Sequence, residues 1–127
     1  MAFRFGLRGL FAALLIAVAS LWSGAASADT FTWVMKNGHP RILEVKFYSS
    51  DRNVVWPGGN KVYKMTDRAT KNYRISCDTG EYICYGAWVS GEPSGTYWGV
   101  GYGGNKGCKG CCYECNGGQS RLFNFTQ

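Results

Sequence analysis

The segment Cys108-Lys-Gly-Cys111-Cys112-Tyr-Glu-Cys115 holds four of the six cysteines of this 127-residue chain within eight residues. Sulfurs at this density are bridged to one another, bound to a metal or redox-active, and each state implies a different class of protein. The compartment in which the chain folds helps to decide between them, because disulfides persist where the surroundings are oxidising. The start of the chain carries that information.

Residues 1–28 have the three parts of a secretory signal peptide. Two arginines precede an apolar run over residues 10–22, and Ala26-Ser27-Ala28 fits the A-x-A cleavage pattern. The apolar run is shorter than the roughly 20 residues that a membrane-spanning helix needs, which argues against an uncleaved anchor. We therefore expect residues 29–127 to be a single periplasmic or secreted domain that contains all six cysteines and no stable membrane span after cleavage.

The composition of residues 29–127 indicates a small all-β domain. Without Arg4 and Arg8 the chain keeps 12 basic against 8 acidic residues, a mild positive charge that favours anionic partners without identifying one. Abundant glycine and aromatic residues are typical of short strands joined by tight turns. A domain of this size buries a limited core, so disulfides would add substantially to its stability. We expect a small antiparallel β-sandwich or barrel, stabilised by disulfides.

Alternation of apolar and polar residues predicts where the strands lie. Residues 82–89 are the most apolar run and are expected at the centre of a sheet, whereas residues 90–95, which include Pro93, are expected to form a loop. No segment has a helical stripe. The expected strands are residues 30–36, 43–47, 53–56, 62–65, 72–77, 82–89, 96–102 and 121–126.

The two cysteines outside the cluster are predicted to pair with each other. If Gly80-Glu81 is a two-residue hairpin turn, Cys77 lies directly opposite Cys84 on the neighbouring strand. Directly opposed residues are about 4.5–5.5 Å apart at Cα, within reach of a disulfide. We therefore favour a bridge between Cys77 and Cys84, although six cysteines allow about fifteen connectivities in all.

The four clustered cysteines, Cys108, Cys111, Cys112 and Cys115, have three interpretations. A zinc site normally uses two C-x-x-C pairs separated by a long segment, whereas these pairs abut. A redox C-x-x-C motif should begin a helix that lowers the thiol pKa, and no helix signal is present here. We therefore expect structural disulfides and no metal. Zinc binding and thiol redox chemistry remain the alternatives.

The segment Tyr97-Trp98-Gly99-Val100-Gly101-Tyr102-Gly103 is the best candidate for a binding surface. On one continuous strand, Trp98 and Tyr102 share a face and lie about 13 Å apart, a spacing suited to stacking two sugar rings. Glycines on the opposite face would let a ligand or another backbone approach closely. The alternative is that Trp98 packs in the core and that the glycines only admit contact between sheets.

A basic run follows the third expected strand and could assist binding. Five positive charges lie within fourteen residues, and Asp67 is the single acidic residue among them. Such a run can contact phosphate or acidic sugar, or it can be a solvated sheet edge that deters pairing with other chains. Nucleic acid is an improbable partner for an exported protein. The residues of the run are Lys61, Lys64, Arg68, Lys71 and Arg74.

Catalysis finds little support in the sequence. The one histidine, His39, lies in an Asn-Gly-His-Pro turn, where a polar loop residue is the ordinary explanation. No G-x-S-x-G, H-E-x-x-H or phosphate-binding loop occurs. Paired carboxylates could still meet in space, as glycoside hydrolysis requires. We therefore expect a protein that is not an enzyme and that uses no cofactor.

Several motifs, taken in order, resemble an uncharacterised family of small exported bacterial domains. The resemblance covers nearly all of residues 29–127 and implies an exported bacterial protein, but it carries no activity, ligand or site residue. The motifs are Phe47-Tyr48-Ser49, Trp56-Pro57-Gly58-Gly59-Asn60, Gly80-Glu81-Tyr82-Ile83-Cys84-Tyr85-Gly86-Ala87-Trp88, Tyr97-Trp98-Gly99-Val100-Gly101 and Cys111-Cys112-Tyr113-Glu114-Cys115.

Together these patterns favour an exported, non-enzymatic binding module for a cell-envelope or surface glycan. The ligand would stack on Trp98 and Tyr102, with help from the basic run. A first alternative is a module that binds another protein at the envelope through the same aromatic residues. A second is a thiol redox or zinc-binding protein that acts through the cysteine cluster.

Overall fold

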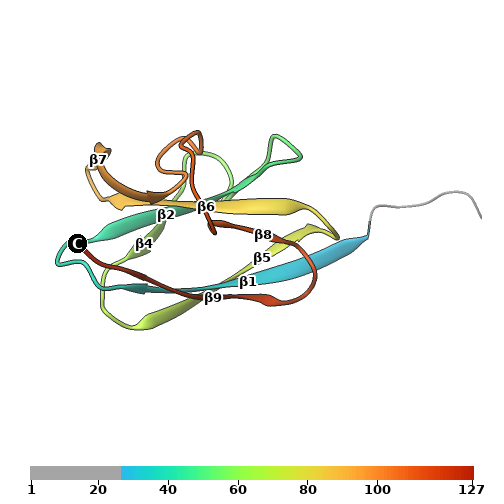
Figure 1. Ribbon diagram of the computed structural model, residues 1–127, viewed down its shortest axis with the longest axis horizontal. Coiled ribbons are helices and arrows are strands. Elements are labelled where there is room, and N and C mark those ends of the chain that lie inside the picture. The colour runs from blue at the N-terminus through green and yellow to red at the C-terminus, as the bar shows by residue number, and fades with distance from the viewer. Residues whose placement is uncertain (1–26) are drawn as a thin grey trace, which may run out of the picture.

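The computed structural model describes residues 27–127 and shows two packed β-sheets (Figure 1). The predicted signal peptide lies outside the described residues except for Ser27 and Ala28. No helix within residues 27–127 is long and apolar enough to cross a membrane. All the regular structure there consists of strands, so the predicted all-β, disulfide-stabilised fold is confirmed.

Nine strands form the two sheets, one ordered β5-β1-β9 and the other β3-β2-β6-β7 with β4 paired to β2 and β8 paired to β6. Neighbouring strands are antiparallel, except that β9 runs parallel to β1. The strands are β1 (Ala28–Asn37), β2 (Leu43–Ser49), β3 (Val55–Trp56), β4 (Tyr63–Met65), β5 (Thr70–Asp78), β6 (Tyr82–Val89), β7 (Glu92–Gly99), β8 (Cys112–Glu114) and β9 (Gln119–Phe125).

The core lies between the sheets and is built from the alternation that predicted the strands. In β1 the side chains of Phe31, Trp33 and Met35 point inward and are buried, while their neighbours are half-buried. The Trp33 ring stacks on Phe47 of β2 with 5.1 Å between ring centroids, so this pair joins the two layers. Aromatic pairs of this kind add about 0.5–1.5 kcal/mol beyond the area that they bury.

Strand β6 is the centre of the second sheet, as its apolar sequence predicts. One edge of β6 pairs with β2 over seven residues. The other edge is shared by β7, which covers the second half of β6, and β8, which covers its first three residues. The chain between β7 and β8 therefore leaves this edge and returns to it.

The six cysteines form three disulfides: Cys77 with Cys115, Cys84 with Cys112 and Cys108 with Cys111. The first connects the end of β5 in one sheet to the residue that follows β8 in the other. The second connects residues directly opposite each other on β6 and β8, with Cα atoms 4.0 Å apart. The third closes a short loop just before β8.

The predicted bridge between Cys77 and Cys84 is wrong. The segment between β5 and β6 is not a hairpin, because β5 pairs with β1 in the first sheet whereas β6 belongs to the second. A turn closed by the Glu81 N–H and the Asp78 carbonyl carries the chain from one sheet to the other. Strands β5 and β6 therefore do not lie side by side, and Cys77 and Cys84 each pair with a cysteine of the later cluster.

Three further expectations differ from the structure. Residues 90–95 are not a loop throughout, because β7 already begins at Glu92. The strand expected over residues 96–102 ends at Gly99, whose φ of +64° is a conformation that glycine adopts readily and other residues rarely do. Strand β8 was not expected, since three residues inside a cysteine cluster carry no alternation signal.

The three disulfides should differ in their resistance to reduction. Cys108 is exposed, whereas Cys77 and Cys115 are 4% and 0% exposed. A thiolate must reach a sulfur in order to exchange with it, so under native conditions the Cys108–Cys111 bridge should open first and the Cys77–Cys115 bridge last. Alkylation of samples taken during limited reduction, followed by peptide mass mapping, measures this order.

The same reduction in denaturant is the control, because unfolding removes the difference in access between the bridges. Alkylated Cys77 appearing before alkylated Cys108 under native conditions would contradict the order expected from burial.

Candidate functional site

A glycine-rich loop, residues 101–110, leaves the edge of β6 and returns to the same place. The Val100 N–H donates to the Tyr85 carbonyl (2.9 Å), and the Tyr85 N–H donates to the Cys111 carbonyl (3.0 Å). Both ends of the loop are thus fixed by one residue of β6. Compact loops with closely spaced ends are often functional, because a rigid scaffold holds them in place.

The glycine-rich loop packs on the outer face of the second sheet, the face turned away from the core (Figure 1). Gly86 of β6 lets the loop approach, since a side chain there would overlap the Gly101 carbonyl group. Gly104 lies so close to the Tyr48 ring that a side chain there would overlap it, and the Gly103 N–H donates to the Tyr48 hydroxyl oxygen (3.2 Å). Burial raises the pKa of Tyr48, so its hydroxyl remains neutral at physiological pH.

Tyr102, at the start of the loop, covers a second, smaller apolar cluster on this face. Its ring meets the edge of Trp88 with 5.1 Å between centroids. Trp88 is buried although it points away from the main core. Tyr97 of β7 lies directly opposite Trp88 across the strand pair and therefore faces the same side. The outer face thus carries Tyr102 packed on a buried tryptophan and Tyr97 as the cross-strand partner of that tryptophan.

A hollow of about 290 Å³ opens between these tyrosines and the first part of β7. It forms because residues 93–96 leave the ladder between the Glu92–Val89 and Tyr97–Trp88 pairs. Its size is close to the lower end of small-molecule sites, which span roughly 300–1,000 Å³. We call it the tyrosine hollow; its lining residues are Pro93, Ser94, Gly95, Tyr97, Tyr102, Asn105 and Lys106.

The tyrosine hollow combines exposed rings with a few polar groups. The Tyr97 and Tyr102 side chains are 45% and 56% exposed. The Lys106 ammonium lies 5.8 Å from the centroid of the Tyr97 ring, within the range of a cation–π contact. The Asn105 amide and the Ser94 hydroxyl add hydrogen-bonding groups.

The structure corrects the expected platform of Trp98 and Tyr102. Because the strand ends at Gly99, the two side chains do not share a strand face. Trp98 points to the inner side, where its ring packs against Phe125 and His39 with centroid separations of 5.4 and 5.6 Å. Tyr102 stays available on the outer side, and its neighbour there is Tyr97.

The residues of the basic run do not line the tyrosine hollow. Lys61 precedes β4, and Lys64 lies on it opposite Glu44; β4 borders β2, at the edge of the second sheet remote from β7. Lys71 and Arg74 lie on β5 in the other sheet, and Lys71 forms an ion pair with Asp67 (3.1 Å). These four predicted binding residues therefore form no common site with Tyr102.

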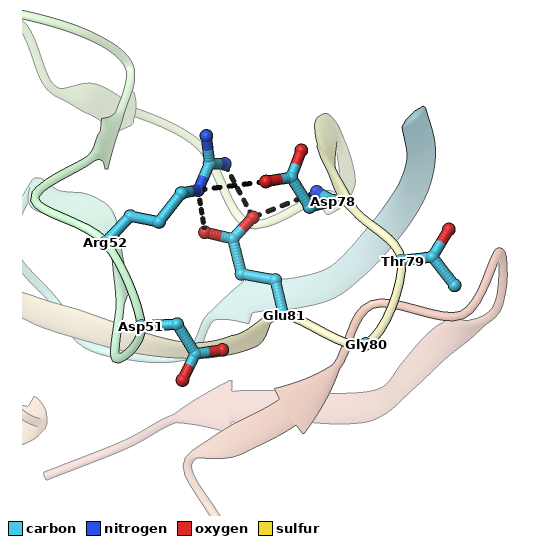
Figure 2. Close-up of a pocket in the computed structure, with 6 residues that line it drawn as sticks. All are labelled: Asp51, Arg52, Asp78, Thr79, Gly80 and Glu81. Atoms are coloured by element: carbon cyan, nitrogen blue, oxygen red, sulfur yellow. Dashed lines mark hydrogen bonds and ion pairs between the residues drawn. The ribbon is translucent and has the colours of Figure 1, made fainter. Parts of the chain in front are cut away.

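A second cavity, of about 240 Å³, lies where the two sheets meet at the turn between β5 and β6 (Figure 2). Glu81 is at its centre, with a side chain only 2% exposed. Arg52 donates to both of its carboxylate oxygens (2.6 and 2.7 Å), and the Asp78 N–H donates to one of them (3.0 Å). The Ser49 hydroxyl is a further donor to the same carboxylate.

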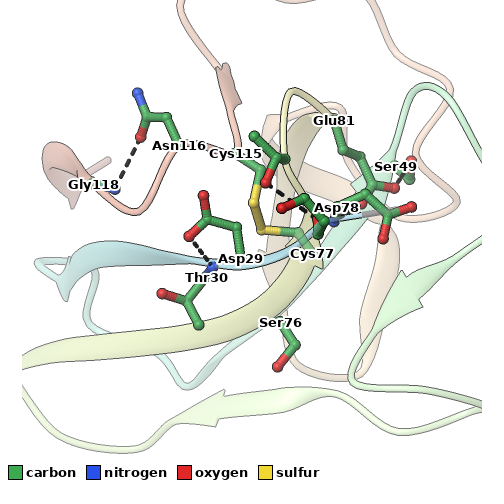
Figure 3. Close-up of a disulfide and its surroundings, with 12 residues drawn as sticks. Asp29, Thr30, Ser49, Ser76, Cys77, Asp78, Glu81, Cys115, Asn116 and Gly118 are labelled. Atoms are coloured by element: carbon green, nitrogen blue, oxygen red, sulfur yellow. Dashed lines mark hydrogen bonds between the residues drawn. A yellow bond between two sulfur atoms is a disulfide. The ribbon is translucent and has the colours of Figure 1, made fainter. Parts of the chain in front are cut away.

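This cavity is best explained as structural. The Arg52 guanidinium holds the pKa of Glu81 near 2, so the carboxylate is ionised and its oxygens are occupied by protein donors. The neighbouring Asp51 carboxylate accepts the Tyr82 N–H (2.8 Å). Figure 3 shows Glu81 and Ser49 beside the Cys77–Cys115 disulfide, so the ionic and covalent links hold the same junction.

The cysteine cluster offers neither free thiols nor metal ligands among the described residues. The sulfurs of Cys84, Cys111 and Cys112 lie within 4.8 Å of one another, but each belongs to a disulfide. A metal is bound by the thiolate, which a bridged cysteine does not provide. The disulfides instead fix the return of the glycine-rich loop.

Compared with known proteins, the chain matches no family model, no curated protein and no solved structure. Any function of the tyrosine hollow must therefore be inferred from its own residues.

Sequence reasoning found Tyr102 but missed the other aromatic and polar side chains of the tyrosine hollow, which are Ser94, Tyr97, Asn105 and Lys106. Alternation along a strand makes either Tyr97 or Trp98 face outward, and the structure buries the more apolar ring. That preference could have indicated Tyr97. Asn105 and Lys106 lie in a loop without periodicity, and no pattern in the sequence predicts where their side chains lie.

Replacing Gly86 should destabilise the fold through the glycine-rich loop. In Gly86→Ala the new methyl group overlaps the Gly101 backbone, and overpacking of this kind costs about 1–3 kcal/mol. Urea denaturation of the oxidised protein measures the loss. Gly107→Ala is the matched control, because a methyl group at that loop position meets no atom within 4 Å. Equal stability of the two variants would contradict the close packing of the loop.

Glu81 should make stability depend on acid pH. Its pKa is lowered from 4.5 to about 2 in the folded state, so the carboxylate stabilises the fold above about pH 4.5, and this contribution is lost as the pH falls toward 2. The shift corresponds to roughly 3 kcal/mol at neutral pH. Glu81→Gln should lose this contribution, and its difference from wild type should shrink between pH 4.5 and pH 2.

Denaturant unfolding at a series of pH values measures this difference. The exposed Glu114→Gln is the control and should follow the wild-type curve. Parallel curves for wild type and Glu81→Gln down to pH 2 would show that the carboxylate does not contribute as described.

Proposed function

We propose that this protein is an exported, non-enzymatic module that binds a glycan in the tyrosine hollow. The observation that carries the proposal is the pair of exposed rings, Tyr97 and Tyr102, beside polar groups in a hollow of about 290 Å³. Sugar rings present apolar C–H faces and polar hydroxyl edges. A site that joins tyrosine faces with hydrogen-bonding side chains matches both.

The way in which the hollow is held supports binding. The edge contact with buried Trp88 restrains the Tyr102 ring, and the fixed ends of the glycine-rich loop restrain its backbone. A site ordered before the ligand arrives loses less conformational entropy on binding. The lining residues include no pair of carboxylates of the kind that hydrolyse glycosidic bonds, which favours binding over cleavage.

Export is part of the proposal. The three disulfides indicate an oxidising environment for the folded chain. The leader pattern in residues 1–28 adds the expectation of a periplasmic or secreted location, where envelope and surface glycans are the available partners.

A protein partner is the second candidate, and one observation favours it. Strand β7 borders β6 on one side only in the described sheet, and its side chains are largely exposed. An exposed edge can pair with a strand of another chain, and tyrosines are frequent hot spots in protein interfaces. The two candidates are distinguished by whether the purified domain binds a glycan or another protein.

Removing either exposed ring should weaken glycan binding without unfolding the protein. Tyr97→Ala and Tyr102→Ala are each expected to reduce affinity at least about tenfold, or about 1.4 kcal/mol. A glycan array identifies the ligand, and titration calorimetry measures the affinity. Tyr82→Ala is the matched control, since Tyr82 is 47% exposed but lies at the opposite end of β6.

Unchanged affinity in both hollow variants, with their thermal transitions intact, would reject the hollow as the binding site. If no glycan binds while an envelope protein co-purifies with wild type and not with Tyr97→Ala, the protein-partner function replaces the glycan-binding one.

A further inference from the structure

Resting on the glycan-binding function proposed above, we infer that the tyrosine hollow selects a sugar that carries a carboxylate, and that Lys106 is the residue that recognises it. The ligand class is thus an acidic oligosaccharide that contains uronate units. The inference depends on the charges at the hollow and on the position of one ammonium group.

Lys106 is the one charged residue that lines the tyrosine hollow. It forms no ion pair with any of the residues 27–127. The Glu92 carboxylate lies beside Gly95 of the hollow, but it is already paired with Arg41 at 2.7 Å. The hollow therefore presents a single uncompensated positive charge.

The fold directs this charge toward the ring surfaces. The Lys106 N–H donates to the Val100 carbonyl (3.1 Å), which ties its backbone to the fixed start of the glycine-rich loop. Its ammonium lies over the Tyr97 ring. A sugar seated against Tyr97 would thus meet the ammonium at its edge. An ammonium has three donors, and a ligand carboxylate would give it a stronger partner than the ring face does.

The single lysine distinguishes between kinds of anionic sugar. Sites for phosphate groups generally supply several backbone N–H groups or a forked guanidinium to a doubly charged ligand. The tyrosine hollow supplies one ammonium, one amide and one hydroxyl, from Lys106, Asn105 and Ser94. This set suits one negative charge surrounded by hydroxyl groups, which is the chemistry of a uronate.

A matched pair of ligands tests the inference. Uronate oligosaccharides of two types, oligogalacturonate and alginate oligomers, are compared with the same oligosaccharides after their carboxylates have been reduced to alcohols. Wild type should bind at least one acidic oligosaccharide about fivefold or more tightly than its reduced form, because a partly exposed ion pair contributes a modest affinity that is screened by salt.

Lys106→Met should lose this preference and bind the acidic and reduced forms about equally, since the rings, the amide and the hydroxyl do not distinguish a carboxylate from an alcohol. Lys109→Met is the control: Lys109 is an exposed lysine close in sequence that does not line the hollow, and its variant should keep the preference. Thermal unfolding of all three proteins establishes that each is folded. The wild-type preference should also decrease as salt is raised.

The possible results separate this inference from the function on which it rests. Equal binding of acidic and reduced forms, or a preference that survives in Lys106→Met, would overturn the carboxylate inference and leave glycan binding standing. Tighter binding of a sulfated oligosaccharide than of any uronate would overturn the assignment of a carboxylate. If neither form binds and a glycan array is also negative, the proposed function itself fails.

Discussion

The link between Cys77 and Cys115 lies at the point where the two sheets of this domain meet, and much of the architecture depends on that junction. The chain crosses from β5 to β6 through a turn closed by Asp78 and Glu81. The backbone of Cys115 is hydrogen-bonded to the same turn, through Gly80 and Glu81. Arg52 adds an ionic contact from the loop that follows β2. A covalent bond, a backbone network and a partly buried ion pair thus stabilise one short segment, and strands of both sheets extend from it.

Much of the fold could be predicted because period-two alternation is a local property. β1, β2 and β5 each bury one face, so the alternation in their sequences indicates which side chains point to the core. The bridge between Cys77 and Cys84 was predicted wrongly because pairing is not local: the Gly80-Glu81 turn is compatible with a hairpin and with a crossing between sheets. Nothing within the turn itself tells the two apart, and the choice is made by partners such as β1 and β2 that lie far away in the sequence.

Single residues of the candidate site were also hard to predict, because their positions depend on contacts with residues elsewhere in the fold. Tyr102 could be identified from its composition and neighbours, but Trp98 and Tyr97 exchange roles according to where β7 ends and which ring enters the core. The positive φ of Gly99 and the approach of Gly101 to Gly86 set that end. A loop that follows the strand turns Tyr102 back over Trp88, and the position of Lys106 depends on the path of the same loop.

The parallel pairing of β1 with β9 has a consequence for the order of folding. The first strand of the domain lies between β5 and the last strand, so one of its edges has no partner until the final residues are present. Contacts between such distant segments form slowly, because a long loop must close first. A chain that emerges from a ribosome amino end first therefore holds an incomplete first sheet until the residues of β9 have emerged. The strand that is made first gains its second neighbour last.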